Sequence, residues 1–306
     1  MPKSITPIEG WPTGVRAAFT TRGLGCELVQ PAVAGRVDQT HETNSTNGTD
    51  AAGMRTDFDG LNLGAHVGDE PSRVLFHRQA VEQFIGAKPI WLNQIHGAEV
   101  LRVDGHQRPT AQAPLTSLST SLSSDLPAVD GLITNQAGQA ACIMAADCLP
   151  VLAATTDGQW VGAAHAGWRG LAAGVLENLL KAMTEAQNQA QEQDQQRAAA
   201  QDPSVMVWLG PCIGPQAFEV GPEVLQAFEL QATDPLVQPS QRPQHFYLDL
   251  AGLAARRLQQ WALDHRVTLD LRNQDQACTW SDPERYYSHR RSAPCGRMAF
   301  LIWREA

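Results

Sequence analysis

The stretch Leu149-Pro-Val-Leu-Ala-Ala-Thr-Thr156 is followed by Asp157-Gly158 and then by Gln159-Trp-Val-Gly-Ala-Ala164. Two apolar, partly β-branched runs joined by an Asp-Gly dipeptide are the strongest short signal for a β-hairpin. A two-residue loop at this dipeptide predicts a register in which His165 lies opposite Pro150. The sequence therefore predicts two buried antiparallel strands, with a histidine at the end of the second.

Cys148 directly precedes the first of these strands, and the same register places it opposite Gly167. Side chains alternate along a strand, so Cys148 and Pro150 share one face, although proline predicts irregular pairing at this point. Cys148 and His165 are then diagonal neighbours, about 7–8 Å apart at the backbone, which is close enough for both side chains to bind one ion. Because cysteine is often buried as a small apolar residue, an ordinary core position explains Cys148 equally well.

A third potential metal ligand is His96, in Asn93-Gln-Ile-His-Gly97. It follows the strand-like run 89–92 and precedes the strand-like run 99–103, so it lies near a strand end or in a turn. Two histidines and one thiol suit zinc, and three protein ligands instead of four are typical of a catalytic site with one open position. No local pattern places His96 beside the other two residues. These patterns are therefore compatible with a metal site and also with ordinary core positions.

The composition excludes several classes of function. The chain has 306 residues, enough for one large domain or two ordinary ones, and a formal net charge of −9. This charge argues against binding of nucleic-acid polymers or anionic membrane surfaces, but it allows a small anionic substrate in a local basic pocket. No apolar run reaches the roughly 20 residues of a membrane span, and the start of the chain lacks the apolar region of a signal peptide. Six scattered cysteines are typical of reduced thiols, so we expect a cytoplasmic protein.

Three polar or low-complexity stretches, at residues 27–56, 105–127 and 185–202, are expected to be insertions on a single domain that spans residues 1–306. The third is rich in Gln and Ala, and it predicts a polar helix extension that ends before Pro203. Between the insertions, strand and helix signals alternate in a way that predicts an α/β fold with a mixed sheet. Helices are predicted at 70–86, from Leu171 through Met183, at 222–232 and at 248–264, and strands at 15–20, 89–92, 99–103, 128–134, 140–144, 205–209 and 298–303.

Seven short motifs follow one another along the chain: Asn62-Leu-Gly-Ala-His-Val-Gly-Asp69, Asn93-Gln-Ile-His-Gly97, Asp130-Gly-Leu-Ile-Thr134, Ala146-Asp-Cys-Leu-Pro150, His165-Ala-Gly-Trp-Arg-Gly170, Gly210-Pro-Cys-Ile-Gly214 and Gly296-Arg-Met-Ala299. In this order they resemble the YfiH-like, laccase-domain family, whose members are variously called polyphenol oxidase, peptidoglycan editing factor and purine nucleoside phosphorylase. The resemblance runs from about Phe19 to Trp303 and is interrupted only by the three insertions. Several motifs of four or more residues in register make it specific.

The resemblance implies a four-layer α-β-β-α sandwich with mixed β-sheets. It also implies a zinc site formed by His96, Cys148 and His165, the same three residues that the local patterns single out. The implied activity is phosphorolysis of adenosine, inosine or methylthioadenosine, together with deamination of adenosine. Zinc with an open position suits both reactions, because it can polarise a phosphate or activate a water. The expected partners are a purine nucleoside and phosphate, and the expected state is a monomer or weak homodimer.

Three further residues at matched positions are candidates for catalysis: His66, Arg78 and Arg169. His66 suits proton transfer, but a loop histidine at the mouth of the site is an equally good interpretation. Arg169 carries a fixed, planar positive charge that suits phosphate. Arg78 falls on a predicted helix, where a phosphate-binding role competes with a surface charge or a structural ion pair. Its neighbour His77 departs from the asparagine expected at that position.

Three other functions compete with the phosphorylase. Copper-dependent oxidation of phenols is disfavoured, because the nine histidines include no His-x-His pair. A thiol hydrolase with Cys148 as nucleophile and His165 as base, acting on misincorporated peptidoglycan precursors, is chemically reasonable, although zinc on the thiolate would compete with it. A non-enzymatic, zinc-stabilised interaction module would need a fourth protein ligand, for which His66 is the candidate.

Overall fold

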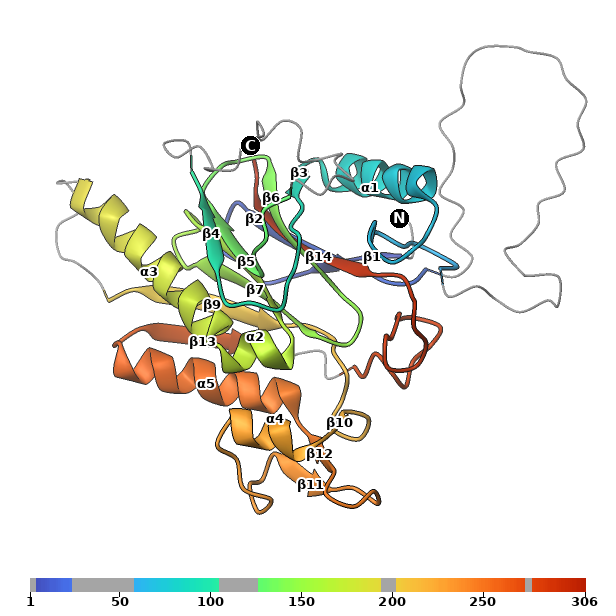
Figure 1. Ribbon diagram of the computed structural model, residues 1–306. Coiled ribbons are helices and arrows are strands. Elements are labelled where there is room, and N and C mark those ends of the chain that lie inside the picture. Colours follow the sequence, from blue (N-terminus) through green and yellow to red (C-terminus); the bar gives the residue numbers. More distant parts are fainter. Residues whose placement is uncertain (1–3, 24–57, 105–125, 194–201, 273–276) are drawn as a thin grey trace, which may run out of the picture.

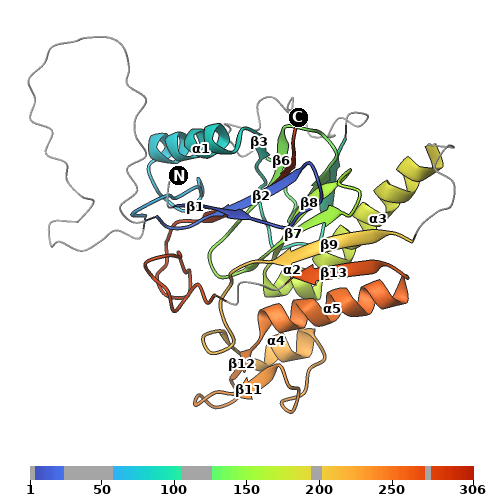
Figure 2. The ribbon, with the colours of Figure 1, turned by 180° about the vertical axis from the view of Figure 1, so that it is seen from behind.

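The computed structural model describes residues 4–23, 58–104, 126–193, 202–272 and 277–306. The stretch 27–56 therefore lies outside the described residues, as do most of 105–127 and residues 194–201 of the third stretch. The described helices and strands form four layers, with helices outside two packed mixed sheets (Figures 1 and 2). The fold expected from the sequence is confirmed.

The first sheet has five strands in the order β1 (Ile5–Ile8), β2 (Val15–Thr20), β14 (Met298–Arg304), β6 (Gln139–Ala145) and β3 (Lys88–Ile90). β3 runs parallel to β6, and the other neighbours are antiparallel. The final strand, β14, lies inside this sheet, where Phe300 is opposite Phe19 of β2 on one side and Ile143 of β6 on the other. The helix α1 (Pro71–Ile85) packs on its outer face (Figure 1).

The second sheet has six strands in the order β13 (Thr268–Arg272), β9 (Ser204–Leu209), β7 (Leu149–Thr155), β8 (Val161–Ala166), β5 (Gly131–Thr134) and β4 (Val100–Val103). Only the two edge pairs, β13 with β9 and β4 with β5, are parallel among these described strands. The helices α3 (Val175–Gln193) and α5 (Leu250–Asp264) cover its outer face (Figure 2). A small third sheet is formed by β10 (Glu219–Val220), β12 (Phe246–Leu248) and β11 (Val237–Pro239), next to α4 (Pro222–Ala227).

Three buried apolar clusters fill the spaces between the four layers. The first packs α1 on the five-stranded sheet and includes Val81 and Trp91. The second lies between the two sheets, where the rings of Phe19 and Phe300 stack with centroids 5.8 Å apart. The third packs the six-stranded sheet against α3 and α5 and includes Leu176. Because such interiors are close-packed, the strand ends of one sheet are held at fixed positions relative to those of the other.

The hairpin predicted from the sequence has the predicted register, with Pro150 of β7 opposite His165 of β8. Its loop is longer than predicted, because β7 ends at Thr155, whose N–H donates to the Trp160 carbonyl oxygen at 2.9 Å. Asp157 accepts hydrogen bonds inside this loop from the Thr155 hydroxyl and the Gln159 N–H. The register is unchanged because the extra residues on the two sides of the turn are equal in number.

The helix predicted from Leu171 onward is not continuous, which corrects the sequence analysis. A short helix, α2 (Trp168–Ala172), ends before Gly174, whose φ of 95° is incompatible with a right-handed helix, and α3 begins afresh at Val175. The helix predicted at 222–232 is likewise shorter, because α4 stops at Ala227 and Glu229 has a φ of 53°. None of the described helices is long and apolar enough to cross a membrane.

Candidate active site

The chain crosses from the five-stranded to the six-stranded sheet at two neighbouring points. The first crossing, residues 91–99, connects β3 to β4, and the second, residues 146–148, connects β6 to β7. Because β3 and β6 are parallel neighbours, their carboxyl ends lie side by side, and both crossings begin there. We call these two segments the ligand crossovers, since His96 lies on the first and Cys148 on the second.

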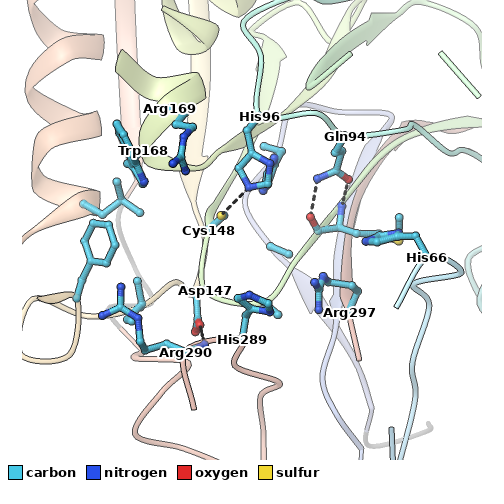
Figure 3. A pocket seen from close by; sticks show the side chains of 17 residues that line it. His66, Gln94, His96, Asp147, Cys148, Trp168, Arg169, His289, Arg290 and Arg297 are labelled. Atoms are coloured by element: carbon cyan, nitrogen blue, oxygen red, sulfur yellow. Dashed lines mark hydrogen bonds between the residues drawn. The ribbon is translucent and has the colours of Figure 1, made fainter. Parts of the chain in front are cut away.

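Gln94 connects the first ligand crossover to the end of β6. Its side-chain amide donates to the Met144 carbonyl oxygen and accepts from the Met144 N–H, both at 2.7 Å (Figure 3). The side chain thereby pairs with this peptide group much as a neighbouring strand would. These two hydrogen bonds fix the backbone of the first crossover relative to the end of β6.

His96, Cys148 and His165 come together where the ligand crossovers meet the end of β8. One potential ligand atom from each residue lies within 4.8 Å of the others, and His96 Nε2 is 3.8 Å from Cys148 Sγ (Figure 3). Gly167 leaves the space for this approach, because a Cβ atom there would come within 2.8 Å of the His96 ring and 3.0 Å of the Cys148 sulfur. These three side chains form a group that could hold a metal ion.

Asp130 organises both histidines. Its buried carboxylate accepts a hydrogen bond from His165 Nδ1 at 2.8 Å, and it accepts the backbone N–H groups of Ile95, His96 and Gly97 at 2.6–3.0 Å. Burial opposes the charge on Asp130, but the bonds from His165 and from these N–H groups outweigh it and lower the pKa of this carboxyl. Since Nδ1 of His165 donates to Asp130, its Nε2 is the nitrogen left to bind a metal.

The electrostatics of the group favour a thiolate. Burial opposes charge on both Cys148 and His165, but the attraction between them outweighs it, helped by His96 on the thiol and Asp130 on the imidazole. The pKa of Cys148 is lowered to about 6 and the pKa of His165 is raised to about 9. The thiolate is the form of cysteine that binds metals and attacks electrophiles, so this thiol is prepared for either role at neutral pH.

The group opens into a pocket of about 480 Å³, a size typical of small-molecule sites. Trp168 and Arg169 lie on one side of the ligand residues, and His66 and Arg297 lie on the other (Figure 3). Three guanidinium groups line the pocket, so it is locally cationic although the chain as a whole is acidic. The other lining residues include the polar Asp147, His289 and Arg290 and the apolar Ile213, Phe218 and Leu250.

One wall of the pocket comes from residues 277–297, which contain no helix or strand and which we call the C-terminal wall. Asp147, the residue before the thiol, holds this wall in place. Its carboxylate accepts the hydroxyl groups of Thr279 and Ser288 at 2.6 and 3.0 Å, and the backbone N–H of Arg290 at 2.6 Å. The same short motif therefore supplies a potential metal ligand and the attachment point of the wall.

Of the three further candidates, His66 and Arg169 line the pocket, whereas Arg78 does not. Arg78 is 1% exposed, so it is not a surface charge. Its Nε donates to the Leu63 carbonyl oxygen at 3.0 Å, and its guanidinium lies 4.1 Å from the centre of the Trp91 ring. Burial lowers the pKa of Arg78 to about 10, which leaves it charged at neutral pH. Arg78 therefore supports the loop that leads to His66.

His66 is close to the metal group without belonging to it, as far as the described residues go. Desolvation lowers the pKa of His66, and the positive charges of Arg297 and Arg78 add to this effect. His66 is therefore neutral at pH 7 and able to accept a proton. His77, the position where an asparagine was expected, is buried and its Nδ1 donates to the Asn62 carbonyl oxygen at 2.8 Å.

Neither the local sequence patterns nor the family resemblance indicated a role for Asp130, Asp147 or Arg290. The two aspartates stand within the quoted motifs 130–134 and 146–150. A carboxylate beside strongly apolar strand residues is a signal for a buried hydrogen-bonded group, and this signal could have identified both. Arg290 has no comparable signal, because the C-terminal wall lacks any periodic pattern.

Comparison of the chain with known proteins identifies its family. Residues 45–305 match the family model described as "Multi-copper polyphenol oxidoreductase laccase". A Pseudomonas aeruginosa protein named purine nucleoside phosphorylase is 39% identical over 249 residues, which cover 80% of this chain and 86% of the relative. The Escherichia coli protein named purine nucleoside phosphorylase YfiH is 34% identical over 251 residues, which cover 80% of this chain and 87% of the relative.

Solved structures show the same fold. A Neisseria meningitidis protein of the DUF152 family has a TM-score of 0.69 and 29% identity, and the match covers 99% of this chain and 100% of that one. A Bacillus licheniformis YfiH protein has a TM-score of 0.70 and 22% identity, and the match covers 100% of this chain and 97% of that one. The chain belongs to the YfiH-like, laccase-domain family.

Proposed function

We propose that this protein is a zinc-dependent purine nucleoside phosphorylase that also deaminates adenosine. The observation that carries the proposal is the group of His96, Cys148 and His165, which opens into a cationic pocket and is not closed by a fourth ligand from the described residues. The relatives that are named purine nucleoside phosphorylase support the class of reaction. The extent of the match supports the same proposal, since it covers 80% of this chain and 86% of the relative.

Zinc suits the donor set better than copper does. Two imidazoles and one thiolate are common zinc donors, and three of them leave one position open. Zinc bound there would supply Lewis-acid activation of a phosphate or water oxygen. Copper-dependent oxidation of phenols stays the weaker candidate, since multicopper chemistry needs more histidine ligands than this group offers.

The side chains around the group then have distinct tasks. Arg169 binds phosphate, because its guanidinium presents paired N–H donors to oxygen atoms. His66, neutral at pH 7, moves the proton between the entering oxygen nucleophile and the purine base. Arg78 contributes from outside the pocket by holding the Leu63 carbonyl and with it the loop that leads to His66.

The test is to incubate the purified protein, with its zinc content measured, with adenosine in the presence and absence of phosphate, and to identify the products by mass. Adenine and ribose 1-phosphate that form only with phosphate are the expected result for phosphorolysis. Inosine in both samples is the expected result for deamination. If neither reaction occurs in protein with one zinc per chain, the proposal is wrong.

A thiol hydrolase is the second candidate, and the arrangement of Cys148, His165 and Asp130 favours it. These residues form a nucleophile, a base and a carboxylate that orients the base, and the pKa of the thiol is about 6. Treatment of the zinc-loaded protein with iodoacetamide separates the candidates. A thiol protected by zinc supports the metal ligand, whereas rapid labelling of Cys148 supports the nucleophile.

A further inference from the structure

Two aspartates with buried carboxylates support the active site, and the described residues that donate to one differ from those that donate to the other. Asp130 is 0% exposed and Asp147 is 8% exposed. Asp130 accepts hydrogen bonds from the two histidines of the metal group and from the backbone around one of them. The carboxylate of Asp147 accepts its hydrogen bonds, within the described part of the chain, from the C-terminal wall. The two carboxylates therefore hold different parts of one site.

Asp130 controls the positions of two potential metal ligands at once. Its Oδ1 accepts both the His165 ring N–H and the His96 backbone N–H, and its Oδ2 accepts the N–H groups of Ile95 and Gly97. His96 has a φ of 60°, a conformation that is unfavourable for a residue with a side chain, so this turn needs outside support. Without the carboxylate, the loop loses three hydrogen bonds and His165 loses the partner that selects its tautomer.

Asp147 reaches the substrate side of the pocket. Its carboxylate fixes the Arg290 backbone, and its own carbonyl oxygen accepts the Ile213 N–H at 2.9 Å. Both Arg290 and Ile213 line the pocket, but neither is a potential metal ligand. Arg290 also lies 5.8 Å from the centre of the Phe218 ring, so its backbone position determines the shape of the apolar part of the pocket. A shift of the wall would change the contacts with an organic substrate.

We infer that Asp130 and Asp147 are positioning residues with separate tasks: Asp130 sets the affinity of the site for its metal ion, and Asp147 sets the affinity of the pocket for the nucleoside. The inference rests on the proposed function, because it takes zinc and a purine nucleoside as the bound species. Asparagine is the informative substitution at both positions. It keeps the size of the side chain but replaces one acceptor oxygen by an NH2 group that cannot accept the backbone N–H groups.

The first measurement is metal affinity, which needs no enzymatic turnover. Zinc dissociation constants come from competition with a chelator, and the cobalt-substituted proteins report ligand geometry through their thiolate-to-metal absorption band. In Asp130→Asn the affinity is expected to fall by roughly 10- to 100-fold, with an altered cobalt spectrum. In Asp147→Asn the affinity is expected to stay within about threefold of wild type, because the donors to this carboxylate are Thr279, Ser288 and Arg290, none of which is a potential ligand. Equal losses in both variants would overturn the inference.

The second measurement is the response to adenosine in zinc-saturated protein. In Asp147→Asn the KM for adenosine is expected to rise by about tenfold, more than kcat falls, because the wall contacts the substrate before and during reaction. Ser288→Ala, which removes one of the three donors to Asp147, is expected to shift KM in the same direction by a smaller factor. An unchanged KM in Asp147→Asn would overturn this half of the inference.

Hydrogen exchange separates failure of this inference from failure of the proposed function. Exchange is expected to accelerate at the amides of residues 95–97 in Asp130→Asn and at the amide of Arg290 in Asp147→Asn, each without the other. If wild-type protein binds zinc but converts no nucleoside, the proposed function is wrong, and the metal affinities and exchange rates still decide the division of tasks. If Asp130→Asn does not fold, Asp130→Glu, which keeps the charge but displaces both oxygens, replaces it with the same expected loss of metal affinity.

Discussion

The ligand crossovers and the C-terminal wall enclose the same pocket but are stabilised in different ways. The crossover that carries Cys148 connects two strands that are each paired on both sides. β6 lies between β14 and β3, and β7 lies between β8 and β9. The C-terminal wall contains no strand, and an isolated bridge joins its Cys278 to Cys212. Its backbone is held by side chains, above all Asp147 and Arg291, whose guanidinium donates to the carbonyls of Thr279, Trp280 and Tyr286 at 2.6–2.8 Å.

This difference separates two properties of the site. The positions of the potential metal ligands follow from the paired strands that also stabilise the fold, together with the carboxylate of Asp130. The shape of the substrate side follows from a few polar side chains that can be replaced without disturbing the sheets. Loss of a ligand should therefore abolish the chemistry, loss of core packing should lower stability alone, and loss of a wall contact should act mainly on the substrate.

Removal of a ligand is expected to have the largest effect. In Cys148→Ser, the zinc content should fall to near zero and phosphorolysis to below about 1% of wild type, while the circular dichroism spectrum stays that of the folded protein. Cys142→Ala is the matched control, because this buried thiol on β6 faces α1 and not the pocket. Wild-type activity in Cys148→Ser would contradict a catalytic metal.

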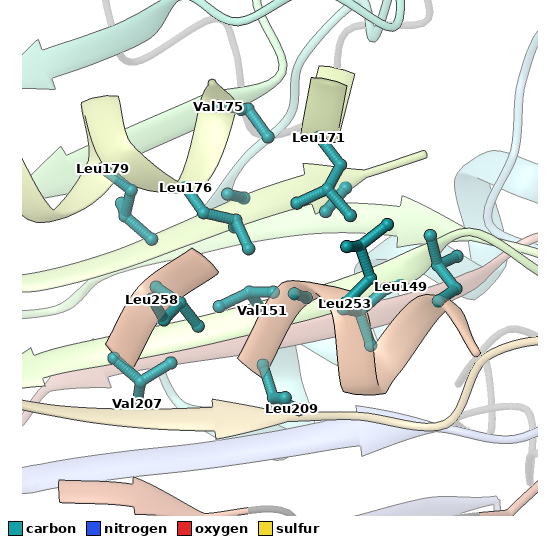
Figure 4. Packing of buried hydrophobic residues seen from close by; sticks show 14 of the residues in the cluster. Leu149, Val151, Leu171, Val175, Leu176, Leu179, Val207, Leu209, Leu253 and Leu258 are labelled. Atoms are coloured by element: carbon teal, nitrogen blue, oxygen red, sulfur yellow. The ribbon is translucent and has the colours of Figure 1, made fainter. Parts of the chain in front are cut away.

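A core substitution tests whether the ligand crossovers tolerate a less stable fold. Leu176 of α3 is 0% exposed and belongs to the cluster between the six-stranded sheet and the helices α3 and α5 (Figure 4). Leu176→Ala should lower the free energy of unfolding by about 2–5 kcal/mol in urea titration, because it removes buried apolar contacts and leaves a cavity. Leu263→Ala, at a position 76% exposed, is the control and should change it by no more than about 0.5 kcal/mol. Zinc affinity that fell together with stability would show that the crossovers depend on the whole core.

The reactivity of the thiol tests the electrostatics of the ligand crossovers in zinc-free protein. Because the pKa of Cys148 is about 6, its thiolate is present above this value and is lost as the pH falls through it. At pH 7, labelling by iodoacetamide should therefore be roughly 30-fold faster than for a thiol with the ordinary pKa near 8.5. Mass spectrometry of peptides, over a series of pH values, gives the midpoint for Cys148 alone. A midpoint near 8.5 would show that the two histidines do not stabilise the thiolate.

A substitution in the C-terminal wall should have the smallest effect on stability and a selective effect on function. Arg291→Gln removes donors to three carbonyls, and because this side chain is half-buried we expect a loss of about 1–2 kcal/mol in the free energy of unfolding. Arg256→Gln is the control, since it breaks an exposed ion pair with Asp234 that contributes at most about 1 kcal/mol. In Arg291→Gln the KM for adenosine should rise while zinc affinity is retained. A change in zinc affinity alone would contradict the separation of the two regions.

The fold could be predicted wherever the residue pattern has a clear period or a clear turn. Asp157-Gly158 determined the register of β7 and β8, because alternation leaves only one face of each strand for the core. The break between α2 and α3 was missed, because Gly174 lies within a run whose apolar residues keep helical spacing on both sides. β1 and the three strands of the small sheet were missed as well, since they are only two to four residues long.

The site could be predicted only as far as its residue types reveal chemistry. His96, Cys148 and His165 are recognisable as potential ligands, and the structure brings them together. The aspartates that hold the site are recognisable only once their donors are known, because those donors are mostly backbone N–H groups from distant segments. The C-terminal wall could not be predicted from the sequence, because irregular backbone held by hydrogen bonds has no periodic residue pattern.

The position of β14 has a consequence for the order of events during synthesis. This strand is the last one in the described chain, yet it occupies the space between β2 and β6, so the five-stranded sheet cannot close until residues 298–304 have left the ribosome. β6 leads directly to the crossover that carries Cys148. A nascent chain therefore contains all three potential ligands long before it contains the framework that holds them. Stable capture of a metal ion is expected only after residues 298–304 have emerged, so a product that lacks them would be released without its metal.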